Sequence, residues 1–297
     1  MNHPSTRTAK RLMFALAALP VFSFGDEPRG VPEQTEKGRE QRLEAMRAQA
    51  AAFEVSFIEK GGEARLNSAP VFRYDDQPRG FVDATLWVWE VDGVPVAIGK
   101  VEDCLNISNG RPYWQYCFTS MSSGRIQVSH PDIEPWRANG PGLTFAEIPD
   151  GPVAASSPAA RLRQMKSMAQ RFSASLVRVK DKQEQRLLPT PVHRFIDKSS
   201  GVTDGAIFSL TTNGTSPTIL LPIVLQQSND ESTTAWKYAI ACMTADAATV
   251  RLDERTVWEK EMTYRPRTFF DTWFFYIRFK EPDKRDATGQ AANGAIR

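Results

Sequence analysis

Histidine, cysteine and the common catalytic motifs are scarce in this sequence. Its 297 residues include three histidines and three cysteines (Cys104, Cys117 and Cys242), without the CxxC or Cys/His spacing of a zinc site. The nucleophile-elbow, zincin, Walker A and Rossmann patterns are all absent. We therefore predict no metal, no cofactor and no catalytic residue, and the sequence favours a protein without enzymatic activity over an enzyme.

Runs of basic residues and long hydrophobic segments are also missing. Without a cluster of Lys and Arg we expect no nucleic-acid partner. The N-terminal apolar run, LMFALAALPVF, has 11 residues and is too short to span a bilayer comfortably. Arg7, Lys10 and Arg11 precede this run, and the small residues Ser23 and Gly25 follow it. This pattern is typical of an export signal, residues 1–25, that is cleaved near Gly25.

Cleavage would leave 34 basic and 35 acidic residues, because the signal contains three basic residues and no acidic one. The mature chain is then nearly neutral. We predict a periplasmic or extracellular location, with an uncleaved anchor or a buried helix as the alternative interpretation of residues 1–25.

The few cysteines allow one disulfide in an exported protein. Cys104 and Cys117 flank the turn-rich stretch NISNGRP, so they could face each other across a hairpin. Such a bond would stabilise the fold by about 3 kcal/mol. Cys117 alternates with Trp114, Tyr116 and Phe118, and we expect it on the outer, wetter face of its strand. The alternative is a pair of free, half-buried thiols, and Cys242 is expected to be buried and inert.

One phrase occurs twice, as PVFRYDDQPRGFVDATLW from Pro70 and as PVHRFIDKSSGVTDGAIF from Pro191. The match continues upstream and downstream and indicates an internal duplication. We divide the chain into the signal 1–25, an N-terminal linker and helix start 26–41, a first unit 42–145, a linker 146–160, a second unit 161–262, and an aromatic strand with a disordered tail, 263–297.

Local patterns predict the same elements in both units. Leu43, Met46 and Ala50 have helical spacing, as do Leu162, Met165 and Ala169. Ser157 followed by Pro158 is a good pair of N-cap and first helical residue for the second helix. Alternating strand patterns follow, with hairpin turns at Asp92–Gly93 and Asn213–Gly214. The expected fold class is α+β, a tandem duplication in which each unit is one amphipathic helix packed on a curved antiparallel sheet of about five to six strands.

A polar set recurs at the same offset in both phrases and supplies the low-specificity candidates for ligand binding. One interpretation is two equivalent sites that pair an arginine with carboxylates. The other is a structural Arg–Asp bridge followed by a turn, which duplicated domains preserve because it defines the fold. The residues are Arg73, Asp76, Asp83, Arg194, Asp197 and Asp204.

His193 also lies in the repeated phrase, but Phe72 occupies the matching position. A site that accepts Phe favours a packing role over a catalytic one. His130 has no partner motif.

The stretch RTFFDTWFFYIRFK, residues 267–280, places aromatic side chains on both faces of a strand. It is either covered on both sides by the two units or a docking surface for a protein partner or the membrane interface. The candidate surface residues are Phe270, Trp273, Phe274 and Tyr276.

The repeated pattern, together with PAARLRQMKSMAQRFSA and RLLPTPVHRFID, resembles a family of uncharacterised exported bacterial proteins. That resemblance covers most of residues 42–260. It implies export and an internal duplication, and it brings no activity and no catalytic residues.

The sequence thus favours a non-catalytic, exported binding or scaffold protein of the cell envelope, whose partner is an envelope protein or a small ligand. One alternative is a small-molecule-binding protein or hydrolase with a cleft between helix and sheet. Another is a peripheral membrane protein that uses residues 269–279.

Overall fold

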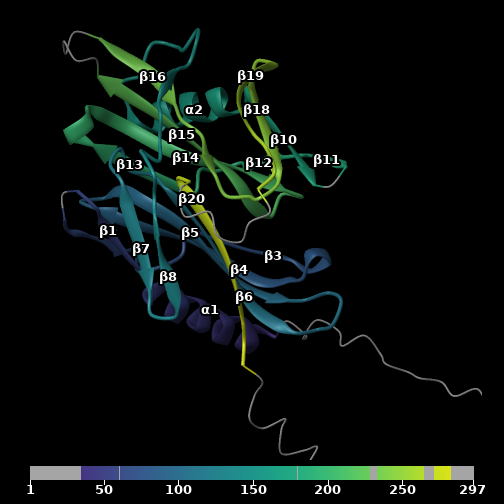
Figure 1. Cartoon of the computed structure of the whole chain (residues 1–297). Helices are drawn as coiled ribbons and strands as arrows, with labels where there is room; N and C mark the ends of the chain where they lie inside the picture. Colours follow the sequence, from purple (N-terminus) through teal and green to yellow (C-terminus); the bar gives the residue numbers. More distant parts are fainter. Residues whose placement is uncertain (1–34, 60, 179, 228–232, 264–270, 282–297) are drawn as a thin grey trace, which may run out of the picture. The chain divides into compact units, whose positions relative to one another are not determined.

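The computed structural model describes residues 35–59, 61–178, 180–227, 233–263 and 271–281, all within one compact unit, Glu33–Arg297. Strands account for 53% of these residues and helices for 15%. Two α-helices are present in the described ranges, α1 (Glu36–Ala51) and α2 (Pro158–Ala169). The predicted α+β fold class is therefore wrong, and the protein is mostly β (Figure 1).

The first sheet joins nine of the described strands. They are β1 (Glu54–Phe57), β2 (Glu63–Leu66), β3 (Phe72–Asp76), β4 (Phe81–Val91), β5 (Val94–Leu105), β6 (Pro112–Ser120), β7 (Ile126–His130), β8 (Ile133–Arg137) and β20 (Trp273–Phe279). Their order is β20-β6-β5-β4-β2-β1-β7-β8, with β3 also paired to β4. The C-terminal strand β20 runs beside β6, more than 150 residues away in the chain (Figure 1).

The two end strands of the first sheet, β8 and β20, come back to each other. The indole of Trp136 in β8 donates to the Asp271 carbonyl at 3.2 Å and stacks on Phe274 of β20, with ring centroids 5.9 Å apart. Between these ends the sheet encloses one apolar core with α1, whose Met46 and Ala50 are fully buried. The curvature lets one sheet cover several sides of a helix.

The remaining strands form two further sheets. The second sheet contains β9 (Ala146–Glu147), β12 (Arg186–Leu187), β13 (His193–Asp197), β14 (Val202–Thr212), β15 (Ser216–Gln227), β16 (Thr234–Tyr238) and β17 (Ala241–Cys242). The third contains β10 (Phe172–Arg178), β11 (Asp181–Glu184), β18 (Ala247–Leu252) and β19 (Arg255–Lys260). The orders are β12-β14-β15-β16-β9, with β13 on β14 and β17 on β15, and β11-β10-β18-β19. Helix α2 shares its core with strands of both sheets.

The first and second sheets pack face to face. Buried apolar residues of β4, β5, β6 and β20 meet those of β14, β15 and β17 in one cluster. Leu86 and Ile98 come from the first sheet, and Ile207 and Leu220 from the second; each is fully buried. The apolar outer face of each sheet is covered by the other, which is why the strands read as nearly continuous apolar runs.

The predicted tandem of two helix-on-sheet units is also wrong, because the strands do not divide into one sheet for each unit. The first sheet has nine strands rather than five or six, and the strands within residues 161–262 divide between two other sheets. Corresponding stretches nevertheless pair alike, since Phe72 lies opposite Leu86 and His193 lies opposite Ile207. Local spacing fixes such neighbouring pairs, but the size of a sheet depends on pairings between distant segments.

Several local predictions are confirmed. The Ser157 side chain caps α2 by accepting from the Ala160 amide at 3.2 Å, and Pro158 is the first helical residue. In both hairpins the two turn residues have positive φ, 52° and 79° at Asp92–Gly93 and 53° and 78° at Asn213–Gly214. This is the turn geometry that matches the twist of the flanking strands.

Candidate binding site

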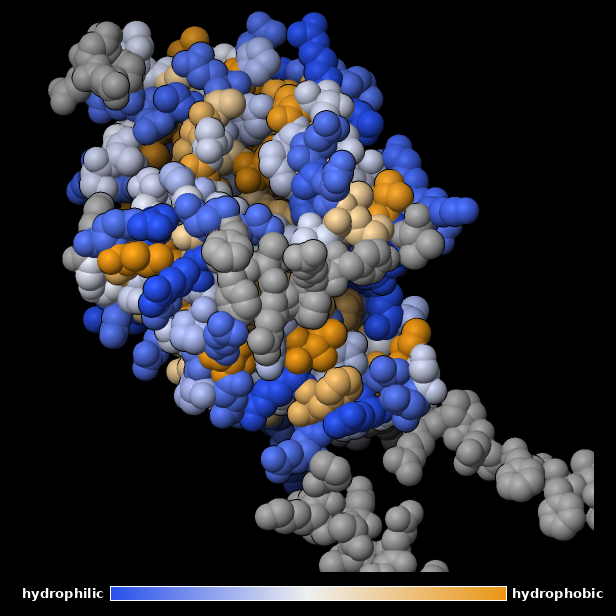
Figure 2. All heavy atoms as spheres, in the orientation of Figure 1, coloured by the Kyte–Doolittle hydropathy of each residue, from blue (hydrophilic) through white to orange (hydrophobic). Residues whose placement is uncertain are grey.

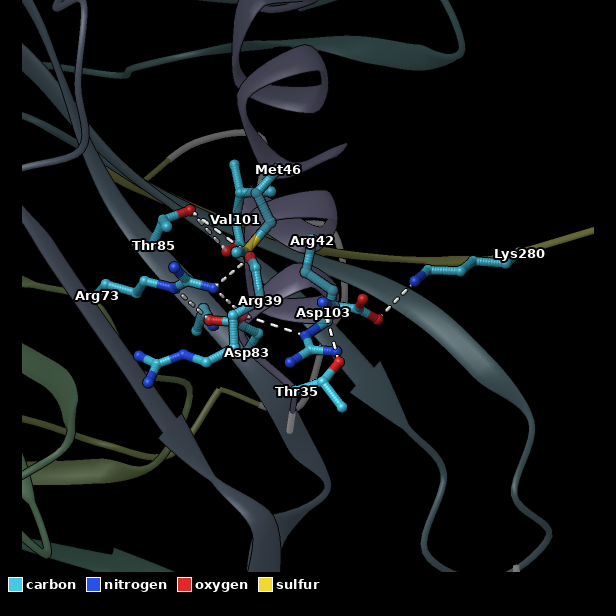
Figure 3. Close-up of polar contacts among 12 residues, drawn as sticks. Thr35, Arg39, Arg42, Met46, Arg73, Asp83, Thr85, Val101, Asp103 and Lys280 are labelled. Carbon is cyan, nitrogen blue, oxygen red and sulfur yellow. Dashed lines mark hydrogen bonds and ion pairs between the residues drawn. The ribbon is translucent and has the colours of Figure 1, made fainter. Parts of the chain in front are cut away.

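The predicted pair of Arg73 and Asp83 is a structural clamp. The Arg73 Nε donates to Asp83 Oδ1 at 2.8 Å, and its Nη2 also contacts the carboxylate. Arg42 from α1 donates to Asp83 Oδ2 at 3.2 Å. Figure 3 shows the two guanidinium groups converging on this carboxylate beside α1. Because Asp83 is buried and Arg73 also reaches the Arg39 carbonyl at 2.7 Å, the cluster fastens the helix to β4.

The second recurring set forms the same clamp. Asp204 accepts from Arg194 at 2.6 Å and from Arg161 of α2 at 2.8 Å. Asp204 is buried, and both of its carboxylate oxygens are occupied. These contacts match the structural interpretation of the recurring residues, and neither Arg73 nor Arg194 lines a described cavity.

The two remaining recurring aspartates do not join the clamps. Asp76 binds Arg79 at 2.7 Å and accepts from the Thr215 hydroxyl of the second sheet at 3.2 Å. Asp197 caps its own turn, η2 (Lys198–Ser200), where it accepts from the amides and hydroxyls of Ser199 and Ser200. Burial opposes ionisation of Asp197, but these hydrogen bonds outweigh it and lower its pKa.

The aromatic candidates on β20 are mostly buried. Trp273 lies between the first and second sheets, Phe274 lies in the α1 core, and Tyr276 packs against that core. Their exposed fractions of 5% for Trp273 and 4% for Phe274 leave no surface for a partner. Phe270 lies outside the described residues. The first residues of β20 are thus covered on both faces, whereas Ile277 and Phe279 near its end are exposed and the strand ends the sheet order.

The predicted disulfide between Cys104 and Cys117 is excluded by the register of β5 and β6. Cys104 lies opposite Tyr113, whereas Cys117 lies opposite Lys100. The offset of four residues separates the two Cα atoms by about 13 Å along the strands, well beyond the limit of about 7 Å for a disulfide. All three cysteines are free and buried.

Cys117 also contradicts the expected wet outer face. It lies in the core between the first and second sheets, because that face of β6 is covered by β17. Burial raises the pKa of Cys117 to about 12 and that of Cys242 to about 11, so both thiols stay protonated and inert at neutral pH.

Neither histidine has the surroundings of a general base. His193 Nε2 lies 3.7 Å from Glu90 Oε2, and burial lowers the pKa of His193. His130 packs on the Phe53 ring, with centroids 4.6 Å apart, and its Nδ1 accepts from the Asp132 amide. No nucleophile contacts either ring among the hydrogen bonds of the described residues.

One cavity lies where an edge of the first sheet faces the second sheet. Its volume is about 940 Å³. The first sheet contributes the β4–β5 hairpin and residues 121–124, and the second contributes residues 195–200, which include the turn η2, and Val202. Apolar walls come from Phe57, Val96, Met121, Leu143, Phe145 and Phe195.

Sequence reasoning found one residue of this cavity, Asp197. One difference between the two repeated phrases could have indicated the cavity. The second phrase has the apolar Ile196 at the position where the first has the charged Asp75. Ile196 lines the cavity and is 53% exposed, unusual for an isoleucine. On the face in view in Figure 2, apolar residues form small groups among hydrophilic ones.

Elsewhere in the interface between the first and second sheets, a buried polar cluster joins the two sheets. Glu102 is fully buried and accepts from Tyr74 and Gln115, each at 2.5 Å. Lys100 lies 3.6 Å from Glu102 and donates to the Pro217 carbonyl of the second sheet at 3.0 Å. Burial and the Glu102 charge raise the pKa of Tyr74 well above its usual value. These contacts fix the two sheets beside β3, whereas the cavity occupies the opposite edge beside β13.

Within the described ranges, histidine, cysteine and carboxylate side chains form no group that could hold a metal ion. None of the described helices combines the length and apolarity needed to cross a membrane. A scan against protein-family models found no match, and searches among curated proteins and solved structures found none either. The cavity is therefore the feature of the described residues that bears on function.

Proposed function

We propose that this protein is a non-catalytic binding protein for a small amphipathic molecule, held in the cavity between the first and second sheets. The cavity carries the proposal, since its volume of about 940 Å³ lies at the upper end of the range for small-molecule sites. Such sites are typically apolar concavities with a few polar groups, and this one combines apolar walls with serines and charged side chains at its rim.

The sequence alternatives have less support. A scaffold or a peripheral membrane protein would need the aromatic side chains of β20 on the surface, and of these Trp273 and Phe274 are buried and only Phe279 is exposed. A hydrolase would need a base beside a nucleophile. Ser122 and Ser123 line the cavity, but neither has a histidine partner among the described hydrogen bonds, and Ser122 Oγ accepts from the Gly124 amide. Binding without chemistry is the simplest use of this site.

Export would expose the cavity to molecules of the periplasm or the medium. We keep export as part of the proposal, on the basis of the basic and apolar pattern of residues 1–25, which lie outside the described residues.

Isothermal titration tests the proposal with two decyl-chain probes, decyltrimethylammonium and decanoate, each below its micellar concentration. We expect saturable binding of one molecule of at least one probe to residues 26–297. Ile196→Asp places a charge on the apolar wall and should weaken binding about tenfold, because a buried hydrocarbon loses contact there. Val153→Asp is the matched control, since Val153 is 94% exposed and does not line the cavity.

Absence of saturable binding for both probes would overturn the proposal. Equal loss of affinity in Ile196→Asp and Val153→Asp would also overturn it, because the effect would then not depend on the cavity.

A further inference from the structure

We propose that the molecule bound in this cavity carries a cationic head, an ammonium group with apolar substituents, attached to an apolar body. This inference rests on the proposed function, and it adds the chemical class of the ligand. Three features of the cavity point to the same charge.

The first feature is the charge of the lining. Glu59, Asp92 and Asp197 contribute carboxylates, and Lys198 contributes the one ammonium group among the described lining residues. Glu59 is neutralised by Arg125, whose Nε lies 2.5 Å from its carboxylate. Among the described lining residues, two aspartates and one lysine then remain, and this excess of negative charge favours a cation.

The second feature is the lack of free donors for an anion at the turn η2. The backbone amides of Ser199 and Ser200 would otherwise be available to bind a carboxylate or a phosphate. Both donate to the Asp197 side chain, at 3.0 and 3.3 Å, and both hydroxyls donate to it as well. The protein's own carboxylate thus occupies the donors that an anionic ligand would need.

The third feature is the aromatic wall. Phe57, Phe145 and Phe195 reach the cavity from three separate segments of the chain. Aromatic faces carry partial negative charge and therefore attract alkylated ammonium groups. A strongly hydrated anion gains no such attraction from an aromatic face. Carboxylates at the rim and aromatic rings in the walls suit a head that is both cationic and apolar.

The test compares three decyl probes with different heads on residues 26–297: decyltrimethylammonium, decanoate and the uncharged decyl glucoside. We expect the cation to bind about fivefold or more tightly than decanoate at low ionic strength. Raising the salt concentration to about 0.5 M should reduce this preference, because exposed charges are screened.

Two substitutions should change the preference for the cationic probe over decanoate in opposite directions. Asp92→Asn removes a rim carboxylate and should weaken cation binding, while Lys198→Gln removes the competing ammonium and should strengthen it. Both positions are exposed, so neither change should disturb the fold. Asp75→Asn is the matched control, since Asp75 is exposed and does not line the cavity.

The outcomes separate the two proposals. Decanoate binding as tightly as the cation, or an unchanged preference in both charge variants, would overturn the cationic head and leave the binding function standing. If none of the three probes binds, both proposals fail.

Discussion

Lys100 and Pro217 are 117 residues apart in the chain, yet the Lys100 ammonium donates a 3.0 Å hydrogen bond to the Pro217 carbonyl. This bond joins β5 of the first sheet to β15 of the second. Lys100 and its neighbour Glu102 are almost completely buried. Polar groups thus join the two sheets inside a largely apolar interface, and the cavity opens at the edge where this cluster is absent.

Removal of Glu102 should destabilise the protein strongly. Glu102→Ala leaves the Lys100 charge buried without its carboxylate and leaves Tyr74 and Gln115 without an acceptor, at a cost of about 3–5 kcal/mol in the free energy of unfolding. Urea unfolding monitored by tryptophan fluorescence measures this loss.

The triple variant Tyr74→Phe, Lys100→Met, Glu102→Leu provides the control for the buried charge. Because it replaces the buried ion pair and Tyr74 with apolar groups, and leaves Gln115 as the one side chain without its acceptor, it should lose much less stability than the sum of the single changes. Additive losses would show that the three side chains do not act as one cluster.

The two Arg–Asp clamps should contribute similarly to stability. Asp83→Asn and Asp204→Asn each remove the charge on which two arginines converge, and each should cost about 3 kcal/mol or more in chemical denaturation. The control is Glu184→Gln, since the Lys182–Glu184 pair is more than half exposed on both sides and should contribute at most about 1 kcal/mol. A change in either Asp variant no larger than that of the control would mean that the clamps do not fasten the helices.

Acid should destabilise the protein partly through His193. Burial lowers the pKa of His193 below its ordinary value of 6.5, while Glu90 opposes this shift. As the pH falls, His193 is therefore protonated in the unfolded chain before it is protonated in the folded one. The contribution of neutral His193 to the free energy of unfolding is complete above pH 6.5 and is lost as the pH falls through the folded pKa.

Phenylalanine, the residue at the matching position 72, gives the variant His193→Phe. The free energy of unfolding, measured by urea titration between about pH 7 and about pH 5, should fall less in this variant than in the natural chain. An unchanged pH dependence would contradict the role of His193. Burial also lowers the pKa of His130, so His130 accounts for a part of the pH dependence of stability that remains in both the variant and the natural chain.

Gly80 and Gly201 end corresponding turns with φ of 82° and 73°, so alanine is strained at both. A Cβ at Gly80 would lie 2.3 Å from the Leu105 carbonyl oxygen, whereas at Gly201 the nearest heavy atom is 3.5 Å away. Gly201→Ala should cost about 1–2 kcal/mol, and Gly80→Ala at least about 1 kcal/mol more. Thermal unfolding of the two variants measures the difference, and equal losses would contradict the close approach of β5 to this turn.

Short-range features of the fold could be predicted from the sequence. The N-cap at Ser157, both hairpin turns and the alternation of Trp114, Tyr116 and Phe118 depend on neighbouring residues, and all of them occur in the structure. The pairing of β20 with β6 and the covering of Cys117 by the second sheet depend on contacts between distant segments. No local spacing encodes such contacts, which is why the fold class and the disulfide were predicted wrongly.

The candidate site was the least predictable part. The recurring residues Arg73 and Asp83 form a clamp, and so do their counterparts Arg194 and Asp204. Apart from Asp197, the residues of the second phrase that line the cavity differ from their counterparts in the first phrase, Ile196 among them. A repeated residue most often maintains a shared fold, and a position that departs from the repeat is a better indicator of a site found in one place only.

A crystal structure of residues 26–297 grown with decyltrimethylammonium is the most direct test of the proposed binding site. The account predicts electron density for one decyl chain in the cavity, along Met121 and Phe195, with the ammonium head at the rim near Asp92 and Asp197. An empty cavity in crystals that bind the probe elsewhere would contradict the account.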